Sequence, residues 1–287
     1  MRVRRDRVIE IKSPEELARM RQAGLVVART LRVLAEAVRP GVTTAELDAI
    51  AAREISLAGA IPSFLGYFDY PATICTSVNE EVVHGIPGQS RRLRPGDIIS
   101  IDCGAILDGW HGDAAISVGV GDIDPADQAL IDACQAALWQ GISRARTGGR
   151  LSDISNAVER SVRASGAYGL IREYTGHGIG TAMHMEPAVP NYGSPGRGPR
   201  LSPGMALAIE PMITRGGRLT TELSDGWTVV TADGSRAAHF EHTVAITPEG
   251  PWVLTAEDGG KTLLSERIVP SALTHGTTAV GEGTDAR

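Results

Sequence analysis

Two histidines stand seven residues apart in the glycine-rich stretch 174–187, which reads YTGHGIGTAMHMEP. Histidine binds metal ions and exchanges protons near neutral pH, so this pair can serve either chemistry. The small residues around His177 let the backbone approach a buried centre, and His184 can reach the same cavity from the other side of the turn. Three other histidines lack such surroundings, and we interpret them as satisfied core or surface groups: His111, His239 and His275.

The segment 99–120, ISIDCGAILDGWHGDAAISVGV, is typical of a β-hairpin. If its two-residue turn is 107–108 or 108–109, Asp102 and Asp113 share one sheet face, directly opposed or one diagonal step apart. Facing carboxylates destabilise a sheet unless a divalent cation neutralises them. The alternative interpretation is that Asp102 faces solvent and Asp113 caps a turn.

Two further acids lie in apolar strand patterns, Glu210 in MALAIEPMI and Glu241 in AHFEHTVAIT. Burying such a charge is costly without a partner, although each could be an edge-strand acid paired with an arginine. Four carboxylates and one histidine form an oxygen-rich, hard site that suits Mn²⁺, Fe²⁺ or Co²⁺ better than structural zinc.

Two capping boxes, Ser13 with Glu16 and Thr43 with Glu46, predict two successive helices, the first ending before Pro40. A similar helix pair is predicted over 124–145 and 150–167. A shift of 107 residues superposes the pairs, for example Leu47 on Ile154 and Gly59-Ala60 on Gly166-Ala167. This faint repeat indicates two duplicated halves with a site at their interface.

Short β-branched runs follow each helix pair, so we expect an α+β fold with helices on one face of a mostly antiparallel sheet. The runs are 72–78, 97–107, 111–120, 204–213, 227–234 and 239–247. We divide the chain into a basic N-terminal segment (1–11), a single catalytic domain (12–265) and a disordered C-terminal tail (266–287).

Composition limits the functional classes. A net charge of −6 over 287 residues argues against nucleic-acid binding, which needs a basic surface. Three cysteines without a CxxC pattern predict reduced thiols in the cytoplasm. We find no apolar run long enough for a membrane span and no signal peptide, and expect no membrane association.

Five ordered motifs now resemble type I methionine aminopeptidases over residues 12 to 255: NEEVVHGIP, IDCGAILDGWHGDAA, GHGIGTAMHMEP, AIEPMI and FEHTVAIT. The resemblance implies the pita-bread fold, in which two pseudo-symmetric αβ halves with a curved antiparallel sheet enclose a two-metal centre. It also implies removal of the initiator methionine from nascent proteins and peptides with a small second residue.

Site roles come from the same resemblance. Asp102 would chelate one divalent ion, Asp113 and Glu241 would bridge both, and His177 and Glu210 would bind the other; the ions would be Mn²⁺, Fe²⁺ or Co²⁺, with Zn²⁺ as a further candidate. An activated water would attack the carbonyl of methionine while Glu210 relays the proton to the leaving amine. His184 would stabilise the oxyanion, and His84 would contact the scissile nitrogen. The methionine pocket would consist of Phe64, Tyr67, Tyr70, Cys75, Met183 and Trp227.

Two rival functions remain open. An X-Pro peptidase would share the metal ligands, but those enzymes generally carry a large N-terminal domain, and only 83 residues precede His84 here. A catalytically inactive binding homologue would be expected to lose ligands, and all five ligand positions are filled. The resemblance further implies nascent polypeptide N-termini as partners, a monomer, and any ribosome association through the surface of the folded domain.

Overall fold

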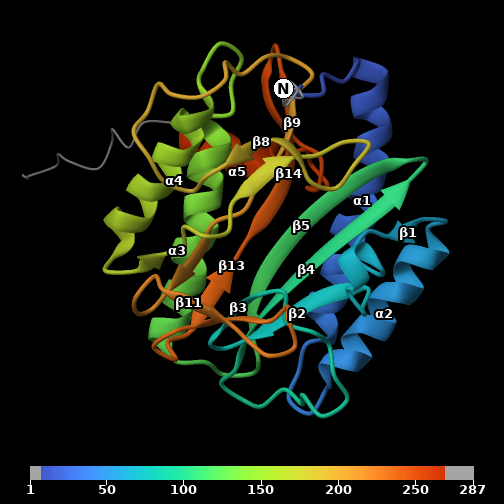
Figure 1. Cartoon of the computed structure of the whole chain (residues 1–287), viewed down its shortest axis with the longest axis vertical. Coiled ribbons are helices and arrows are strands. Elements are labelled where there is room, and N and C mark those ends of the chain that lie inside the picture. Colours follow the sequence, from blue (N-terminus) through green and yellow to red (C-terminus); the bar gives the residue numbers. More distant parts are fainter. Residues whose placement is uncertain (1–7, 269–287) are drawn as a thin grey trace, which may run out of the picture.

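The structure of the chain is a computed structural model that describes residues 8–268 (Figure 1). The predictions for residues 1–7 and for residues 269–287, which include His275, lie outside this range. Residues 266–268, which the prediction assigns to the disordered tail, instead end a helix that runs over Lys261–Ile268. Within the described part, no helix has the length and apolar character needed to cross a bilayer.

Four of the five α-helices in residues 8–268 form where the caps and apolar stripes predict them, and the fifth is a short helix near the C-terminus that the sequence analysis does not predict. In the first, Ser13 Oγ accepts the N–H of Glu16 and the Glu16 carboxylate accepts the N–H of Ser13, which completes the predicted capping box. The helices are α1 (Pro14–Ala37), α2 (Thr44–Leu57), α3 (Pro125–Ser143), α4 (Leu151–Ser165) and α5 (Lys261–Ile268). Helix α2 starts at Thr44 and helix α4 starts at Leu151, so the two starts are separated by 107 residues, the offset of the sequence repeat.

The main sheet runs in the order β1-β4-β5-β14-β9-β7-β8, with β2 paired to β4 and β15 to β14, and its pairs are antiparallel. Its strands are β1 (Ile61–Pro62), β2 (Ile74–Val78), β4 (Ile98–Leu107), β5 (Trp110–Gly119), β7 (Gly176–Gly178), β8 (Met185–Val189), β9 (Ala206–Ile209), β14 (Glu241–Thr247) and β15 (Gly250–Val253). This curled sheet is the α+β, pita-bread architecture that the sequence predicts.

Two smaller sheets and one 3₁₀ turn complete the fold. One sheet has the order β13-β10-β6, and the other has the order β11-β12-β3. The elements are β3 (Glu81–Val83), β6 (Gly169–Leu170), β10 (Met212–Thr214), β11 (Thr220–Glu222), β12 (Val229–Thr231), β13 (Ala237–His239) and the turn η1 (Tyr67–Asp69).

The two helix pairs cover different parts of the sheet, as Figure 1 shows, with α1 and α2 beside β4 and β5 and with α3 and α4 at the other side of the view. Ile101, Cys103 and Ala114 belong to one apolar cluster with residues of α1 and α2, whereas Ile209 and Val244 belong to another with residues of α3 and α4. Because side chains alternate along a strand, the residues next to these in sequence point to the opposite face of the sheet.

Two of the expected strands are each divided into two shorter strands. The run 204–213 divides into β9 and β10 at Glu210-Pro211, because proline has no N–H for the ladder. The run 239–247 divides between β13 and β14 at Phe240. Glu210 therefore lies just after the end of β9, whereas Glu241 is the first residue of β14 and pairs with Ala115 of β5.

Glycine brings α1 unusually close to the sheet. A Cβ on Gly24 of α1 would lie inside contact distance of the Leu254 carbonyl oxygen, and a Cβ on Gly112 of β5 would meet the Gly24 nitrogen at 2.7 Å. Two glycines therefore allow helix backbone to rest directly on strand backbone.

We predict that Gly24→Ala destabilises the fold by about 1–3 kcal/mol, because the added methyl group forces the two backbones apart. This reverses the usual helical preference for alanine over glycine. Urea unfolding measures the change, and Gly88→Ala is the control, because its Cβ would have Ser90 Oγ at 4.0 Å as nearest neighbour. A Gly24→Ala protein as stable as the wild type would contradict the close packing.

Candidate metal centre

The main sheet brings the five predicted metal ligands to its face opposite the helices. Asp102 and Glu241 both pair with Ala115 of β5, from β4 and β14 respectively, so the three residues form one row. Asp113 pairs with Gly104. The hairpin turn is Asp108-Gly109, one of the two predicted, and the two aspartates therefore lie one diagonal step apart.

Strand pairing also brings in the other two residues. His177 of β7 pairs with Ala208 of β9, and Glu210 follows at the end of that strand on the same face as Ala208. His177 Nε2 lies 3.6 Å from Glu210 Oε1 and 3.9 Å from Asp113 Oδ2. The five side chains thus converge from five strands or strand ends.

Charge in this cluster is unbalanced. Asp113 and Glu241 are each only 2% exposed. Asp102 Oδ1, Asp113 Oδ1 and Glu241 Oε1 are buried without a hydrogen-bond partner. Within residues 8–268, no lysine or arginine forms an ion pair with any of the four carboxylates. The alternatives of a solvent-facing Asp102 with a turn-capping Asp113, or of arginine-paired glutamates, do not describe this arrangement.

Burial and mutual repulsion raise the pKa values of these acids. Burial raises the pKa of Asp102 to about 7. Burial first and then the neighbouring carboxylates raise the pKa values of Asp113, Glu210 and Glu241 well above their ordinary range. Such carboxylates need protons or cations to coexist in one site.

The orientation of His177 suits a cation rather than a proton. Its Nδ1 donates to the Gly178 carbonyl oxygen at 3.0 Å, which leaves the Nε2 lone pair directed at the acids. Burial lowers the pKa of His177 to about 3, so the ring is neutral at pH 7. Orphaned oxygens, a neutral imidazole and the hard donor set therefore fit divalent metal ions.

A cavity of about 490 Å³ opens onto the acids, and all of the site residues expected from the sequence line it. Its lining is Phe64, Tyr67, Phe68, Tyr70, Cys75, His84, Asp102, Asp113, His177, Met183, His184, Glu210, Trp227 and Glu241.

Two of the lining histidines stand beside the carboxylates. His184 Nδ1 is 2.9 Å from the Tyr67 hydroxyl, and its ring lies 4.3 Å from the His177 ring, centroid to centroid. His84 has a left-handed backbone with φ of 62°, and its ring meets Tyr174 edge to face. Burial lowers the pKa values of both, that of His84 to about 4.

One end of the cavity is an apolar pocket formed by Phe64, Tyr70, Cys75 and Met183, with Trp227 at its edge. The single Tyr70 hydroxyl proton is shared between the carbonyl oxygens of Ile74 and Gly85, both at 3.1 Å, so this donor is satisfied by backbone. The ring therefore offers only apolar surface to a ligand.

Sequence reasoning missed Phe68 and misinterpreted His239. Phe68 sits in the η1 turn with φ of 47° and is 79% exposed at the cavity, which no local pattern signals. His239 was expected to be a satisfied group, but its Nε2 is buried without a partner near Glu210 and Glu241. Strand periodicity could have found it, because it precedes Glu241 by two residues. The interpretation of His111 is confirmed by its Nδ1 contact of 3.0 Å with Ser63 Oγ.

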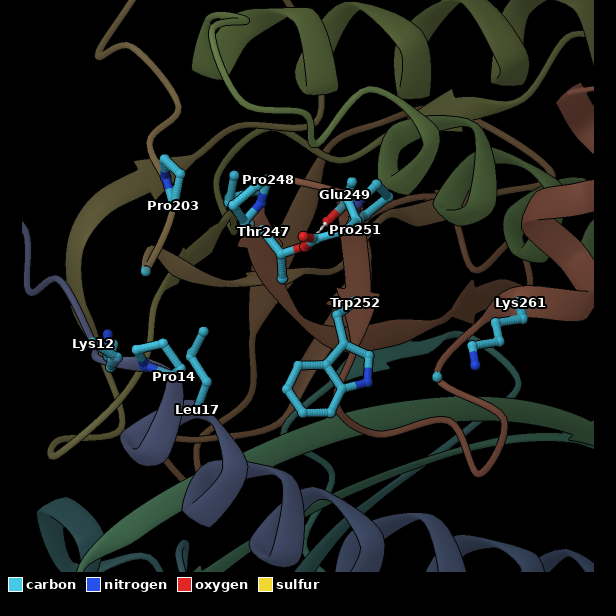
Figure 2. A pocket seen from close by; sticks show the side chains of 14 residues that line it. Lys12, Pro14, Leu17, Pro203, Thr247, Pro248, Glu249, Pro251, Trp252 and Lys261 are labelled. Carbon is cyan, nitrogen blue, oxygen red and sulfur yellow. Dashed lines mark hydrogen bonds between the residues drawn. The ribbon is translucent and has the colours of Figure 1, made fainter.

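A larger hollow of about 760 Å³ lies away from the acids, between the start of α1, the β14–β15 turn and the segment before α5 (Figure 2). Trp252 stands at its centre, and Pro14, Pro203, Pro248 and Pro251 belong to its wall. Its lining has Glu249 as the single carboxylate and no histidine, so it offers no metal-binding set.

Comparison with known proteins places the chain among peptidases. The family model "Metallopeptidase family M24" matches residues 18–248. A methionine aminopeptidase from Mycobacterium tuberculosis is 53% identical over 88% of this chain and 97% of its own length, and one from Bacillus subtilis is 51% identical over 86% and 99%. The crystal structure of a methionine aminopeptidase from Thermotoga maritima superposes with a TM-score of 0.85 at 42% identity, covering 87% of this chain and 100% of that one. A prolidase from Pyrococcus furiosus shares only the fold, at 20% identity and a TM-score of 0.68, over 86% of this chain and 65% of the prolidase.

We predict that divalent cations stabilise the chain more at high pH than at low pH. Because burial raises the pKa of Asp102 from 3.8 to about 7, the cation-free folded chain binds more protons than the unfolded chain between these values. Protonation of Asp102 therefore contributes its full stabilisation to the cation-free folded chain below pH 3.8, and this contribution is lost as the pH rises through about 7. Cation binding replaces the lost protons.

Melting temperatures with Mn²⁺ and with chelator, measured from about pH 5 to about pH 8, test this prediction. The difference between the two curves should widen as the pH rises. A difference that stays constant or narrows would show that the acids do not hold protons in the cation-free protein.

Proposed function

The chain belongs to metallopeptidase family M24 and is a metal-dependent hydrolase of peptide bonds, and from this premise we propose that it removes N-terminal methionine from nascent proteins and peptides with a small second residue. The observation that carries the proposal is a single cavity in which four carboxylates, two buried and two half-buried, adjoin an apolar pocket. A site of this kind combines a metal-binding wall with a wall that accepts an apolar side chain.

Five residues would hold the metal ions: Asp102, Asp113, His177, Glu210 and Glu241. The donors are four carboxylates and one imidazole, which support Mn²⁺, Fe²⁺ or Co²⁺, with Zn²⁺ as a further candidate. When bound, such cations supply Lewis acidity that polarises a peptide carbonyl and lowers the pKa of water.

Glu210 would move the proton that the reaction requires. Burial and the nearby aspartates raise its pKa well above that of an exposed glutamate, so its carboxyl group takes up a proton more readily than an exposed glutamate does. Its Oε1 is directed at His177, and the side chain lines the cavity. It can therefore pass the proton to the leaving amine.

His184 would donate a hydrogen bond to the carbonyl oxygen as negative charge develops there. If the Tyr67 hydroxyl donates to Nδ1, the ring proton resides on Nε2, where it is available to the substrate. Burial lowers the pKa of His184, so the neutral ring is the donor. His84, beside Trp227, would contact the scissile nitrogen.

The pocket lining favours an unbranched, polarizable side chain. Met183 and Cys75 supply sulfur, and Tyr70 and Trp227 meet edge to face with ring centroids 4.9 Å apart. Sulfur–aromatic contacts are favourable, so a methionine side chain gains more than its apolar area among these groups.

The substrate class also suggests where the chain works. Nascent N-termini are the partners we propose, with ribosome contact through the surface of the folded domain. We further propose that the chain is a monomer and that it works in the cytoplasm. The buried free thiols Cys75, Cys103 and Cys134 support the second proposal, because they suit a reducing compartment.

Peptide hydrolysis tests the proposed function directly. Chelator-stripped protein should release methionine from Met-Ala-Ser only after single additions of Mn²⁺, Fe²⁺, Co²⁺ or Zn²⁺ under anaerobic conditions, and it should leave Ala-Pro-Ser intact. Preferential cleavage of Ala-Pro would make the chain an X-Pro peptidase. Metal binding without cleavage of either peptide would make it a binding homologue.

We predict that His184→Ala folds and binds metal but turns over methionyl peptides about 10²–10³-fold more slowly, because an oxyanion donor is lost. Tyr67→Phe should give a smaller loss, about 3- to 10-fold in kcat, because it removes one neutral hydrogen bond to the same ring. Steady-state kinetics at saturating metal measure both. Near wild-type kcat in metal-loaded His184→Ala would remove His184 from the reaction.

A further inference from the structure

His239 stands next to the candidate metal centre but is absent from the ligand set that the family resemblance implies. It ends β13, two residues before Glu241, and both side chains therefore project to the same side of the extended chain. Ser117 Oγ accepts the His239 N–H at 2.9 Å and donates to its carbonyl oxygen at 2.8 Å, which fixes the backbone at this residue.

The imidazole has a buried nitrogen with no hydrogen-bond partner. His239 is 1% exposed, and its Nε2 is one of the unsatisfied buried atoms in the described part of the chain. Leaving a buried polar atom unsatisfied costs about 1–3 kcal/mol, so a native structure rarely does so without a reason.

The nearest charged groups are two of the proposed metal ligands. His239 Nε2 lies 3.8 Å from Glu210 Oε2 and 4.0 Å from Glu241 Oε2. Both separations exceed hydrogen-bond length. They match the separations of 3.6 and 3.9 Å between His177 Nε2 and its carboxylate neighbours.

Such separations are those of ligands around one ion. Two atoms about 2.1 Å from the same cation lie between about 3 and about 4 Å apart, depending on the angle between them. Glu210 directs Oε1 toward His177 and Oε2 toward His239, so its two oxygens face two different nitrogens. The three groups Glu210, His239 and Glu241 meet the distance requirement for a shared cation.

We propose that His239 is a second imidazole ligand of the metal centre, and that its Nε2, with Glu210 Oε2 and Glu241 Oε2, bounds a cation position adjoining that of His177. The inference rests on the metal dependence in the proposed function but not on its peptide specificity. His239 does not line the 490 Å³ cavity, so a cation held there leaves the space for the peptide free.

Counting the imidazoles bound to Mn²⁺ tests the proposal in the wild-type chain. Pulsed electron paramagnetic resonance of the Mn²⁺-loaded protein should show nitrogen couplings from two imidazoles. His239→Gln should leave one and should weaken Mn²⁺ binding at least about tenfold in calorimetric titration.

His242→Gln is the matched control. It is a neighbouring histidine with the same substitution, and its Nδ1 contacts Thr255 Oγ1 at 2.8 Å while its ring packs on Trp139. This variant should keep two imidazole couplings and wild-type affinity.

A wild-type spectrum with a single imidazole coupling would overturn the proposal, even if His239→Gln failed to fold. Unchanged couplings and affinity in folded His239→Gln would do the same. Metal-dependent methionine release with one coupling would leave the proposed function intact and reject only the role of His239. Failure of the wild type to bind Mn²⁺, Fe²⁺, Co²⁺ or Zn²⁺ would reject both.

Discussion

The repulsion among four carboxylates on one face of a sheet is the constraint on which the rest of the fold depends. Removing an ion from water costs several kcal/mol even after the protein relaxes, and like charges add to this cost. Without cations, Asp102, Asp113, Glu210 and Glu241 can stay together only if protons neutralise part of their charge, in keeping with their raised pKa values. The two apolar clusters beneath the helix pairs pack against the strands that carry these acids and stabilise them by apolar burial.

The sheet meets this constraint by holding the backbone of the acid-bearing strands in place with hydrogen bonds between strands. Asp113 donates its N–H to Thr243 Oγ1 at 3.0 Å, and Thr243 Oγ1 donates to the Asp113 carbonyl oxygen at 2.8 Å, which joins β5 to β14 beside the ladder. Ser117 joins β5 to His239 in the same way. Asp102, Asp113 and Glu241 are therefore attached to strands that neighbouring strands hold in place, and Glu210 directly follows another, which limits how far the four acids can move apart.

Much of this arrangement could be predicted from the sequence because it depends on local rules. Capping boxes located α1 and α2, and period-2 alternation placed Asp102 and Asp113 on one face and limited the turn to two registers. The wall of the apolar pocket could not be derived in this way. Phe64, Met183 and Trp227 come from three loops, and the resemblance to a family, rather than any spacing, brought them together. His239 was missed because a lone histidine suggests a satisfied core residue. Its spacing of two residues from Glu241, which puts both side chains on one side of an extended chain, could nevertheless be read from the sequence.

The η1 turn that carries Tyr67 and Phe68 has a consequence for how this enzyme can diversify. The acids lie on strands whose replacement would disturb the whole sheet, whereas this wall of the cavity is a short segment with left-handed residues at Phe68 and Asp69 and no strand partner. Substitutions there can reshape the entrance while the hydrolytic machinery stays in register. Selectivity toward inhibitors and side chains can therefore drift between lineages faster than the chemistry itself.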